Sequence, residues 1–208
     1  VLHLRRASAE RNFASNVRSN LFRGVFATAQ AALASAPPTR PLSYDNEGSA
    51  NLYLERLQID DYDYPSMFWL KQSFDEGMTS LVDVGGSIGI KYFAFGEFMS
   101  YPSNLLWRVI DMPAVAERGR EFAASRGAPA ALQFSGDIAA ADGVDIIYAS
   151  GVLQYLPQTL AEIVAGLKRR PRRIIVNTAA IHPSKSFFTL NSIGTAFCAY
   201  RVQSRDEF

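Results

Sequence analysis

The sequence has a single cysteine, Cys198, among its 208 residues, so no disulfide can form within the chain. For the same reason it has no cysteine cluster that would hold zinc, and we expect no bound metal. No apolar run approaches the roughly 20 residues that a membrane-spanning helix needs, and the N-terminus has no signal-peptide pattern. These absences favour a cytoplasmic protein.

An excess of charge of one sign is also missing. Lysine and arginine number 21 and aspartate and glutamate 20, and the two kinds are interspersed along the chain. This balance predicts no nucleic-acid partner. The composition, 48% hydrophobic and 20% charged, is typical of a globular protein, and the length fits one full-sized domain with a helical extension.

The first part of the chain, residues 1–78, is predicted to be a helical region that covers the substrate side of the protein. From Glu10 to Ala34, apolar residues repeat at four-residue spacing, which is typical of an amphipathic helix. Further helices are expected over Ala50–Leu57 and Ser66–Gly77. In the last of these, Phe68 and Trp69 are interpreted as core residues more readily than as an acceptor wall.

From residue 79 onward the pattern changes to strands that alternate with helices. Strands separated by crossover helices predict a mostly parallel, doubly wound α/β sheet with helices on both faces. Residues 79–208 are therefore assigned to a Rossmann-like domain. Only five strands can be counted before Phe208, so we expect the final antiparallel hairpin of such a sheet to be missing through truncation or disorder, with residues 187–200 forming a loop. The expected strands are LVDVG, LLWRVIDM, ALQFSGD, VDIIYASG and RRIIVNTAA.

The segment that carries most of the functional signal is LVDVGGSIG, residues 81–89. A glycine-rich turn between a strand and a helix lets the backbone approach a ligand closely. The G-x-G-x-x-G spacing of a dinucleotide site and the Walker pattern are both absent. Instead, Asp83 lies two residues before Gly85, which suits a cationic ligand such as S-adenosylmethionine better than a pyrophosphate. A tight turn without any ligand explains the segment alone equally well.

Polar residues follow the next three strands in the order that a nucleoside site requires. Asp111 stands where a carboxylate accepts the hydroxyls of a ribose, although it would also serve as a cap before Pro113. Asp137, with Ile138, could accept the adenine amino group, although an ordinary turn explains it too. Ser150 follows the central strand. These features are stronger together than separately because they recur on successive strand ends.

The motif series resembles that of class I S-adenosylmethionine methyltransferases, and DVGG and IDMP are similar to stretches of small-molecule O-methyltransferases. From about Arg23 onward the chain also resembles a bacterial family of methyltransferases often encoded among surface-polysaccharide genes. The resemblance implies a Rossmann-like methyltransferase fold, S-adenosylmethionine as cofactor and S-adenosylhomocysteine as product. It places the cofactor at eleven residues: Asp83, Gly85, Gly86, Ser87, Gly89, Asp111, Met112, Asp137, Ile138, Ser150 and Gly151.

Three residues are candidates for a catalytic role. Gln154 stands where related O-methyltransferases that deprotonate a phenol often have a histidine, and glutamine cannot act as a base. His182 could serve as a base, although an ordinary loop role is the somewhat better interpretation. Tyr155 and Gln154 could orient an acceptor hydroxyl, or simply pack. Substrate contacts are expected from Tyr62, Tyr64 and Tyr92.

These observations predict methyl transfer to a small-molecule or glycan acceptor, on oxygen, mainly through proximity and orientation. Two alternatives remain open. One is a methyltransferase-like protein that binds the nucleoside or a partner without catalysis, and the other is an NAD-dependent oxidoreductase, against which the missing G-x-G-x-x-G counts. A homodimer is a further hypothesis.

Overall fold

The computed structural model describes residues 2–15, 20–44 and 57–208, and these form two compact units. The larger unit spans residues 50–179, and the smaller one combines residues 1–49 with residues 180–208. This division differs from the predicted boundary between residues 78 and 79. The helix before the first parallel strand belongs to the larger unit, and the last strands of the chain belong with its N-terminal segment. The helix predicted over residues 50–57 lies almost wholly outside the described residues.

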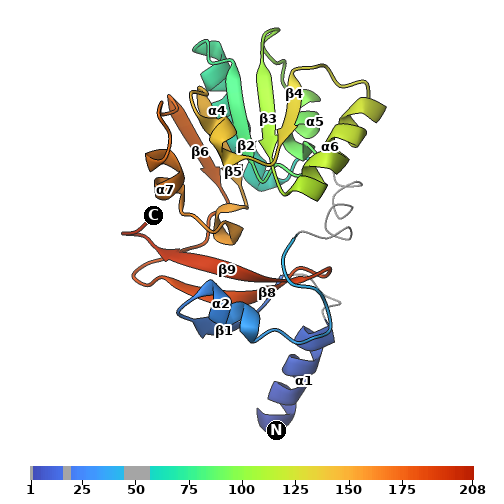
Figure 1. Cartoon of the computed structure of the whole chain (residues 1–208), viewed down its shortest axis with the longest axis vertical. Coiled ribbons are helices and arrows are strands. Elements are labelled where there is room, and N and C mark those ends of the chain that lie inside the picture. The colour runs from blue at the N-terminus through green and yellow to red at the C-terminus, as the bar shows by residue number, and fades with distance from the viewer. Residues whose placement is uncertain (1, 16–19, 45–56) are drawn as a thin grey trace. The chain divides into compact units, whose positions relative to one another are not determined.

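The larger unit is built on a parallel five-stranded sheet, as predicted (Figure 1). Its strand order is β4-β3-β2-β5-β6. From β2 the chain adds β3 and β4 toward one edge of the sheet and then returns to add β5 and β6 toward the other edge, so that β2 and β5 are neighbours. All five predicted strands are present, and every neighbouring pair is parallel. The strands are β2 (Ser80–Val84), β3 (Leu106–Ile110), β4 (Leu132–Ser135), β5 (Ile146–Ser150) and β6 (Arg173–Asn177).

Helices cover both faces of this sheet, which explains why its central strands are buried almost throughout. One face packs against α4 (Tyr64–Asp75), α5 (Ile90–Gly96) and α6 (Pro113–Ser125), in a cluster centred on Trp107 and Tyr148. The other face packs against α7 (Leu160–Ala165) and the short helix η2 (Ile138–Ala141). The predicted two-sided covering is confirmed. A 3-10 turn, η1 (Asp61–Asp63), leads into α4, and another, η3 (Leu153–Tyr155), follows β5.

Helix α4 turns a different side to the core than its sequence suggests. Leu70 and Phe74, one helical turn apart, are buried against the sheet. Phe68 and Trp69 are 61% and 49% exposed, and their rings pack edge to face with centroids 5.3 Å apart. The interpretation of these two residues as core is therefore wrong. An apolar run all around a helix gives little indication of which side faces inward.

The smaller unit contains a four-stranded sheet, where only helices and a loop are predicted from the sequence. Its order is β1-β8-β9-β7. Where one amphipathic helix was expected over Glu10–Ala34, the structure has α1 (Leu2–Ser15), β1 (Leu21–Phe26) and α2 (Ala29–Ala34). The helix prediction is wrong at β1 because this segment, LFRGVF, pairs with β8 and contains Gly24 at φ +76°. Aromatic residues favour a strand there and glycine disfavours a helix.

The expected absence of a final hairpin is also wrong. Strands β8 (Phe187–Ser192) and β9 (Phe197–Ser204) form an antiparallel hairpin from residues that were interpreted as a loop. The hairpin does not extend the five-stranded sheet. Strand β8 pairs with β1 instead, and β9 also pairs with the two-residue strand β7 (Ile181–His182). Strand β8 does not show the usual alternation of apolar and polar residues, because some of its buried residues are polar, such as Asn191 and Ser192.

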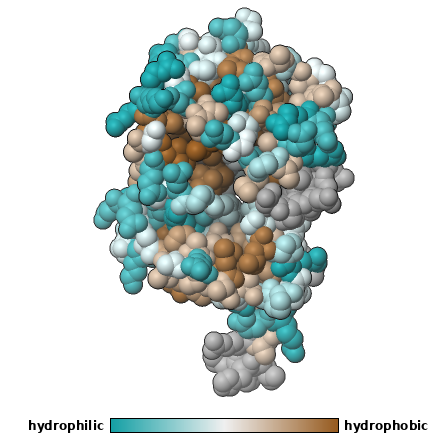
Figure 2. All heavy atoms as spheres, viewed as in Figure 1, coloured by the Kyte–Doolittle hydropathy of each residue, from teal (hydrophilic) through white to brown (hydrophobic). Residues whose placement is uncertain are grey.

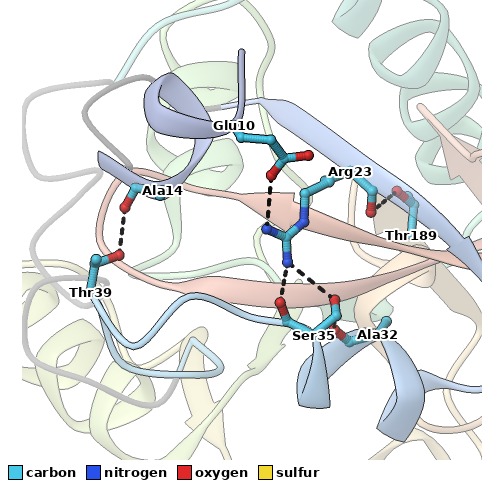
Figure 3. A network of polar contacts seen from close by, with 7 residues as sticks. All are labelled: Glu10, Ala14, Arg23, Ala32, Ser35, Thr39 and Thr189. Carbon is cyan, nitrogen blue, oxygen red and sulfur yellow. Dashed lines mark hydrogen bonds and ion pairs between the residues drawn. The ribbon is translucent and has the colours of Figure 1, made fainter. Parts of the chain in front are cut away.

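Arg23 ties the N-terminal elements of the smaller unit together, as Figure 3 shows. Its guanidinium contacts Glu10 of α1 at 3.3 Å, donates to the carbonyl of Ser35 at the end of α2, and lies 4.9 Å above the ring of Phe13. Its backbone carbonyl accepts a bond from Thr189 of β8 at 3.2 Å. One residue of β1 thus links both helices and the neighbouring strand.

Several large apolar side chains lie at the surface of the described chain. Phe22 and Val25 of β1 are more than half exposed, and hydrophobic residues stand out between hydrophilic ones in Figure 2. The homodimer stays a prediction, which size-exclusion chromatography with light scattering would test. No helix in the described part of the chain is long and apolar enough to cross a membrane.

Candidate functional site

The turn between β2 and α5 is an unusually tight segment. Gly85, Ser87 and Gly89 all have positive φ, at +69°, +55° and +86°. Ser87 is the only one of these with a side chain, and that conformation is costly for it. The Gly85 amide donates to the carbonyl of Ile110 at 2.7 Å, which joins the turn to the end of β3. The loop is therefore held against the carboxyl ends of two neighbouring strands.

Asp83 lies beneath this loop and is 1% exposed. Its Oδ2 accepts a bond from the indole N–H of Trp107 at 3.2 Å. The pKa of Asp83 is raised to about 7, chiefly by burial and also by the nearby charge of Asp111, while the bond from Trp107 and the charge of Lys91 act in the opposite direction. The carboxyl that the sequence placed at the mouth of the loop is thus a buried acid poised near neutrality.

Asp111 follows β3 and holds the loop from the side. Its Oδ2 accepts the backbone N–H of Ser87 at 2.9 Å, and its Oδ1 accepts that of Met112 at 2.8 Å. Burial raises the pKa of Asp111, while these two bonds lower it. Each carboxylate oxygen keeps a further lone pair. Asp111 can therefore support the loop and still accept ligand hydroxyls. Its interpretation as the cap before Pro113 is wrong, because the N-cap of α6 is Met112 and no side chain caps that helix.

The residues predicted after β4 have local structural roles. Asp137 is exposed and caps η2 by accepting the N–H of Ala139 at 2.8 Å. Ile138 is half-buried and packs against the cluster that contains Val144 and Ala141. The local bond to Ala139 supports the interpretation of Asp137 as part of an ordinary turn, and its contact with an adenine stays a prediction. Its second carboxylate oxygen is not used by the cap.

The segment after β5 contains Gln154, one of the three catalytic candidates. Gly151 has φ +67° and donates to the carbonyl of Asn177 at 2.9 Å, while the Ser150 hydroxyl accepts a bond from Asn177 at 3.4 Å. Gln154 is 8% exposed, and its Nε2 donates to the carbonyl of Gly151 at 2.7 Å. Its Oε1 is buried and has no hydrogen-bond partner. A buried acceptor of this kind is costly unless a ligand completes it.

The predicted cofactor residues are thus brought together at one edge of the larger unit. Strands β4, β3, β2 and β5 are consecutive neighbours and parallel, so their carboxyl ends share an edge. Val152, directly after Gly151, packs so closely on the glycine loop that a Cβ at Gly85 would lie 2.3 Å from its Cγ2. Crevices at this edge are where open α/β sheets bind ligands.

The predicted substrate tyrosines do not form one group. Tyr92 is 9% exposed and packs against Tyr101 and Trp107 in the core, so the structure supports its packing role. Tyr62 in η1 and Tyr64 at the start of α4 are both exposed, and the Tyr62 hydroxyl donates to Asp60 at 2.6 Å. Tyr155, in η3, is half-buried.

His182 lies in the smaller unit, where it shapes a turn. Its Nδ1 accepts the backbone N–H groups of Ser184 and Lys185 at 3.2 and 3.1 Å. That nitrogen must be unprotonated to do so, and its lone pair is engaged. The structure therefore favours the ordinary loop role, and the role of His182 as a base stays a prediction without geometric support.

Two charged residues next to the loop were not identified from the sequence. Asp63 is fully buried, and its Oδ2 accepts a bond from Lys91 of α5 at 2.5 Å. A signal existed, because DDYDYP concentrates three acids just before a helix and Lys91 comes two residues after the glycine loop. The described residues contain no cluster of three or more histidine, cysteine, aspartate or glutamate side chains that could hold a metal.

Gly86→Ala is expected to damage both the fold and the site. A Cβ at this position would lie 2.4 Å from Oδ2 of Asp83, and the Asp83 carboxyl is enclosed and cannot swing away. Overpacking of this kind costs about 1–3 kcal/mol. Thermal unfolding followed by tryptophan fluorescence should show a lower Tm, because Trp69 and Trp107 both belong to the larger unit.

Gly166→Ala provides the control for this measurement. A Cβ there would lie 3.5 Å from the Ile163 carbonyl oxygen, an ordinary contact, and Gly166 has φ −76°. Its Tm should stay within a few degrees of the wild type. Equal Tm values for both variants would mean that Asp83 is not held under the loop as described.

No protein-family model matches this sequence, and a comparison with curated proteins finds no match. Solved structures do resemble it. The N-terminal domain of EvdMO1 with SAH bound is 13% identical, with a TM-score of 0.50 over 97% of this chain and 82% of that one. Mitomycin 7-O-methyltransferase MmcR is 24% identical, with a TM-score of 0.42 over 64% of this chain. An O-methyltransferase family protein from Burkholderia thailandensis is 13% identical, with a TM-score of 0.38 over 74% of this chain.

The chain spans 41% of the length of the mitomycin enzyme and 43% of that of the Burkholderia protein. At these identities the likeness concerns the fold. Together with the parallel five-stranded sheet flanked by helices, it confirms the predicted fold class, a Rossmann-like α/β sheet with helices on both faces.

Proposed function

We propose that this chain is an S-adenosylmethionine-dependent methyltransferase that acts on a small-molecule or glycan acceptor. The observation that carries the proposal is the pair of carboxyl groups at the glycine loop. Asp83 lies beneath the loop, and Asp111 accepts the N–H of Ser87 beside it. Two acids at this point favour a ligand with positive charge, which the sulfonium and ammonium groups of S-adenosylmethionine provide.

The same pair argues against a dinucleotide. A phosphate-binding turn offers free backbone N–H groups to the anion. Here the Ser87 N–H is taken by Asp111, the Gly85 N–H by Ile110 and the Gly89 N–H by Gly86. A pyrophosphate would meet negative charge and few available donors. The oxidoreductase alternative therefore has no observation in its favour.

Each residue at the edge of the sheet has a role in this proposal. Asp111 would accept the ribose hydroxyls with its remaining lone pairs, and Met112, which is exposed, would cover the nucleoside. Asp137 and Ile138 would contact the adenine. The turn from Gly85 to Gly89 and the strand end at Ser150 and Gly151 would enclose the amino-acid part of the cofactor, with the Ser87 hydroxyl facing its carboxylate.

When bound, S-adenosylmethionine supplies a methyl group on a sulfonium that is already activated for displacement. The protein then has to bring an acceptor oxygen into line, and positioning alone accounts for much of the rate in such a step. Gln154 suits this task because its Nε2 is fixed by Gly151 while its buried Oε1 is free to accept a bond from an acceptor hydroxyl. It orients the acceptor and removes no proton.

Isothermal titration calorimetry with S-adenosylmethionine, S-adenosylhomocysteine and NAD tests the proposal. We expect both adenosyl ligands to bind and NAD not to bind. Binding of NAD alone would overturn the proposal. If the adenosyl ligands bind but no acceptor oxygen, in a panel of sugars and phenols, is methylated, the alternative of a non-catalytic binding protein is favoured.

A further inference from the structure

A buried ion pair lies beside the glycine loop, and no part of the proposed function uses it. Lys91, in the first turn of α5, contacts Asp63 at 2.5 Å and Asp60 at 3.9 Å. The rings of Tyr62 and Phe95 lie 5.6 and 5.8 Å from its ammonium nitrogen. Two carboxylates and two aromatic faces thus surround one ammonium group, an arrangement that recognises cations of this kind.

The ion pair leaves one acceptor unused. Asp63 is 0% exposed, and its Oδ2 accepts bonds from Lys91 and from the backbone N–H of Asp60 at 2.9 Å. Its Oδ1 is buried and has no hydrogen-bond partner. A buried carboxylate oxygen without a donor is costly. Because Lys91 balances only one of the two aspartates, the group also keeps an excess of negative charge.

This group belongs to the same site as the cofactor residues. The charge of Lys91 acts on Asp83, and the charges of Asp63 and Asp83 both act on Tyr148. Tyr148 is the register partner of Asp83 on the neighbouring strand β5, two residues before Ser150. Asp63 also stands at the start of α4, and α4 and α5 pack with Tyr148 on the same face of the sheet, so the ion pair lies on that face.

We propose that Asp63 binds the ammonium group of a ligand through Oδ1, with Lys91 as the internal ammonium that the ligand competes against. The inference rests on the proposed function, and it adds a residue from the segment before α4 to the site. Two sources of the ammonium share this chemistry, namely the α-ammonium of the cofactor and an amine on the acceptor. Access requires Lys91, which is 15% exposed, to rotate outward.

The first experiment compares S-adenosylhomocysteine with its deaminated analogue, which keeps the carboxylate and lacks the ammonium. Calorimetry should show that the wild type prefers the ammonium-bearing ligand roughly ten- to a hundredfold, the worth of a charge-assisted hydrogen bond. Asp63→Asn should remove most of this preference. Asp75→Asn, an exposed aspartate at the end of helix α4, which begins directly after Asp63, is the matched control and should keep it.

Lys91→Gln gives a change in the opposite direction. Without the competing lysine, the preference for the ammonium-bearing ligand should rise severalfold. If the ion pair had only a structural role, Asp63→Asn and Lys91→Gln would have the same effect. Each would lower the affinity for both ligands by a similar factor and leave the preference unchanged. The preference is a ratio of two affinities for one variant, so partial unfolding of that variant cancels from it.

The second experiment tests the acceptor as the source. The protein saturated with S-adenosylhomocysteine is titrated with ethylammonium chloride while the Asp63 carboxyl carbon is followed by NMR. Tetramethylammonium chloride, which cannot donate a hydrogen bond, is the control. A saturable shift with ethylammonium alone supports an acceptor amine, and a ligand preference that depends on Asp63 supports the cofactor.

If neither effect is seen, the inference is overturned while the proposed function stands. If the wild type fails to bind S-adenosylhomocysteine at all, the proposed function itself fails, and the two failures are therefore distinguishable.

Discussion

Asp83→Asn is expected to stabilise the ligand-free protein above pH 7 while weakening its binding of S-adenosylmethionine. The pKa of Asp83 is raised, chiefly by burial, from its ordinary value of 3.8 to about 7. Between these two pH values the folded chain holds a proton that the unfolded chain has released, so the free energy of unfolding falls as the pH rises. At about 1.4 kcal/mol for each pKa unit, ionised Asp83 costs the fold roughly 4 kcal/mol above pH 7.

Asparagine removes this cost and keeps an oxygen that can accept the bond from Trp107. Its amide N–H would be buried without an evident acceptor, which costs about 1–3 kcal/mol. We therefore expect a net gain of roughly 1–3 kcal/mol at pH 8 and none at pH 4, measured by urea unfolding at both pH values. Binding of S-adenosylmethionine should weaken about tenfold or more, because the ligand's positive charge loses its partner.

Asp145→Asn is the matched control, because its carboxyl has a pKa shifted in the other direction. Burial raises the pKa of Asp145, but hydrogen bonds from Thr79 and Ser80 hold it below its usual value. This variant should lose stability at pH 8. If wild type and Asp83→Asn show the same pH dependence of unfolding, the account of Asp83 is wrong.

Cofactor binding should also release a proton near pH 7. A cation placed beside Asp83 favours its ionised form and so lowers the pKa of a group that is half protonated in the free protein. Calorimetry in two buffers with different ionisation enthalpies measures this release directly. In Asp83→Asn the apparent binding enthalpy should no longer depend on the buffer.

Asp111→Ala is expected to reduce the affinity for S-adenosylhomocysteine by on the order of 100-fold or more. The carboxylate has two tasks, since it would bind the ribose and it holds Ser87 in a conformation with positive φ. Charge-assisted hydrogen bonds contribute about 1.5–3 kcal/mol each, so the loss of two would reach this size. Calorimetry or competition with a fluorescent adenosyl ligand measures the affinity.

Glu117→Ala, an exposed change on α6, is the control for this variant and should bind normally. A 2′,3′-dideoxy ligand separates the two tasks of Asp111. The wild type should bind it much more weakly than the ribose form, and Asp111→Ala should no longer distinguish the two. Unchanged affinity in Asp111→Ala would show that the ribose assignment is wrong.

The larger unit could be predicted because its strands are buried on both faces. A strand of this kind appears as a short apolar run bounded by glycine or a charged residue, and all five were found in order. The smaller unit was missed for the opposite reason. In β1 the apolar residues happened to follow a helical spacing, and its partner β8 comes about 160 residues later, which no local pattern reveals.

The sequence predicts where the site lies, but not how its side chains are buried and hydrogen-bonded. Strand ends place Asp83, Asp111 and Ser150 at one edge of any parallel sheet. Sequence alone does not show that Asp83 is enclosed by Gly86 and Trp107, or that Asp111 holds the Ser87 amide. Nor does it connect Asp63 with Lys91 across 28 residues. These contacts depend on the length and direction of each side chain and on the residues that pack over it in the folded chain.

The pairing of β1 with β8 has a consequence for biosynthesis. The larger unit is continuous in sequence, so it can fold as soon as residues 50–179 leave the ribosome. Strand β1 is made early and gains its partner only when residues near the end of the described chain appear, on the order of 10–30 s later at typical translation rates. During that interval its apolar Phe22 and Val25 lie on an unpaired edge, where a chaperone or a second nascent chain has its best opportunity to bind.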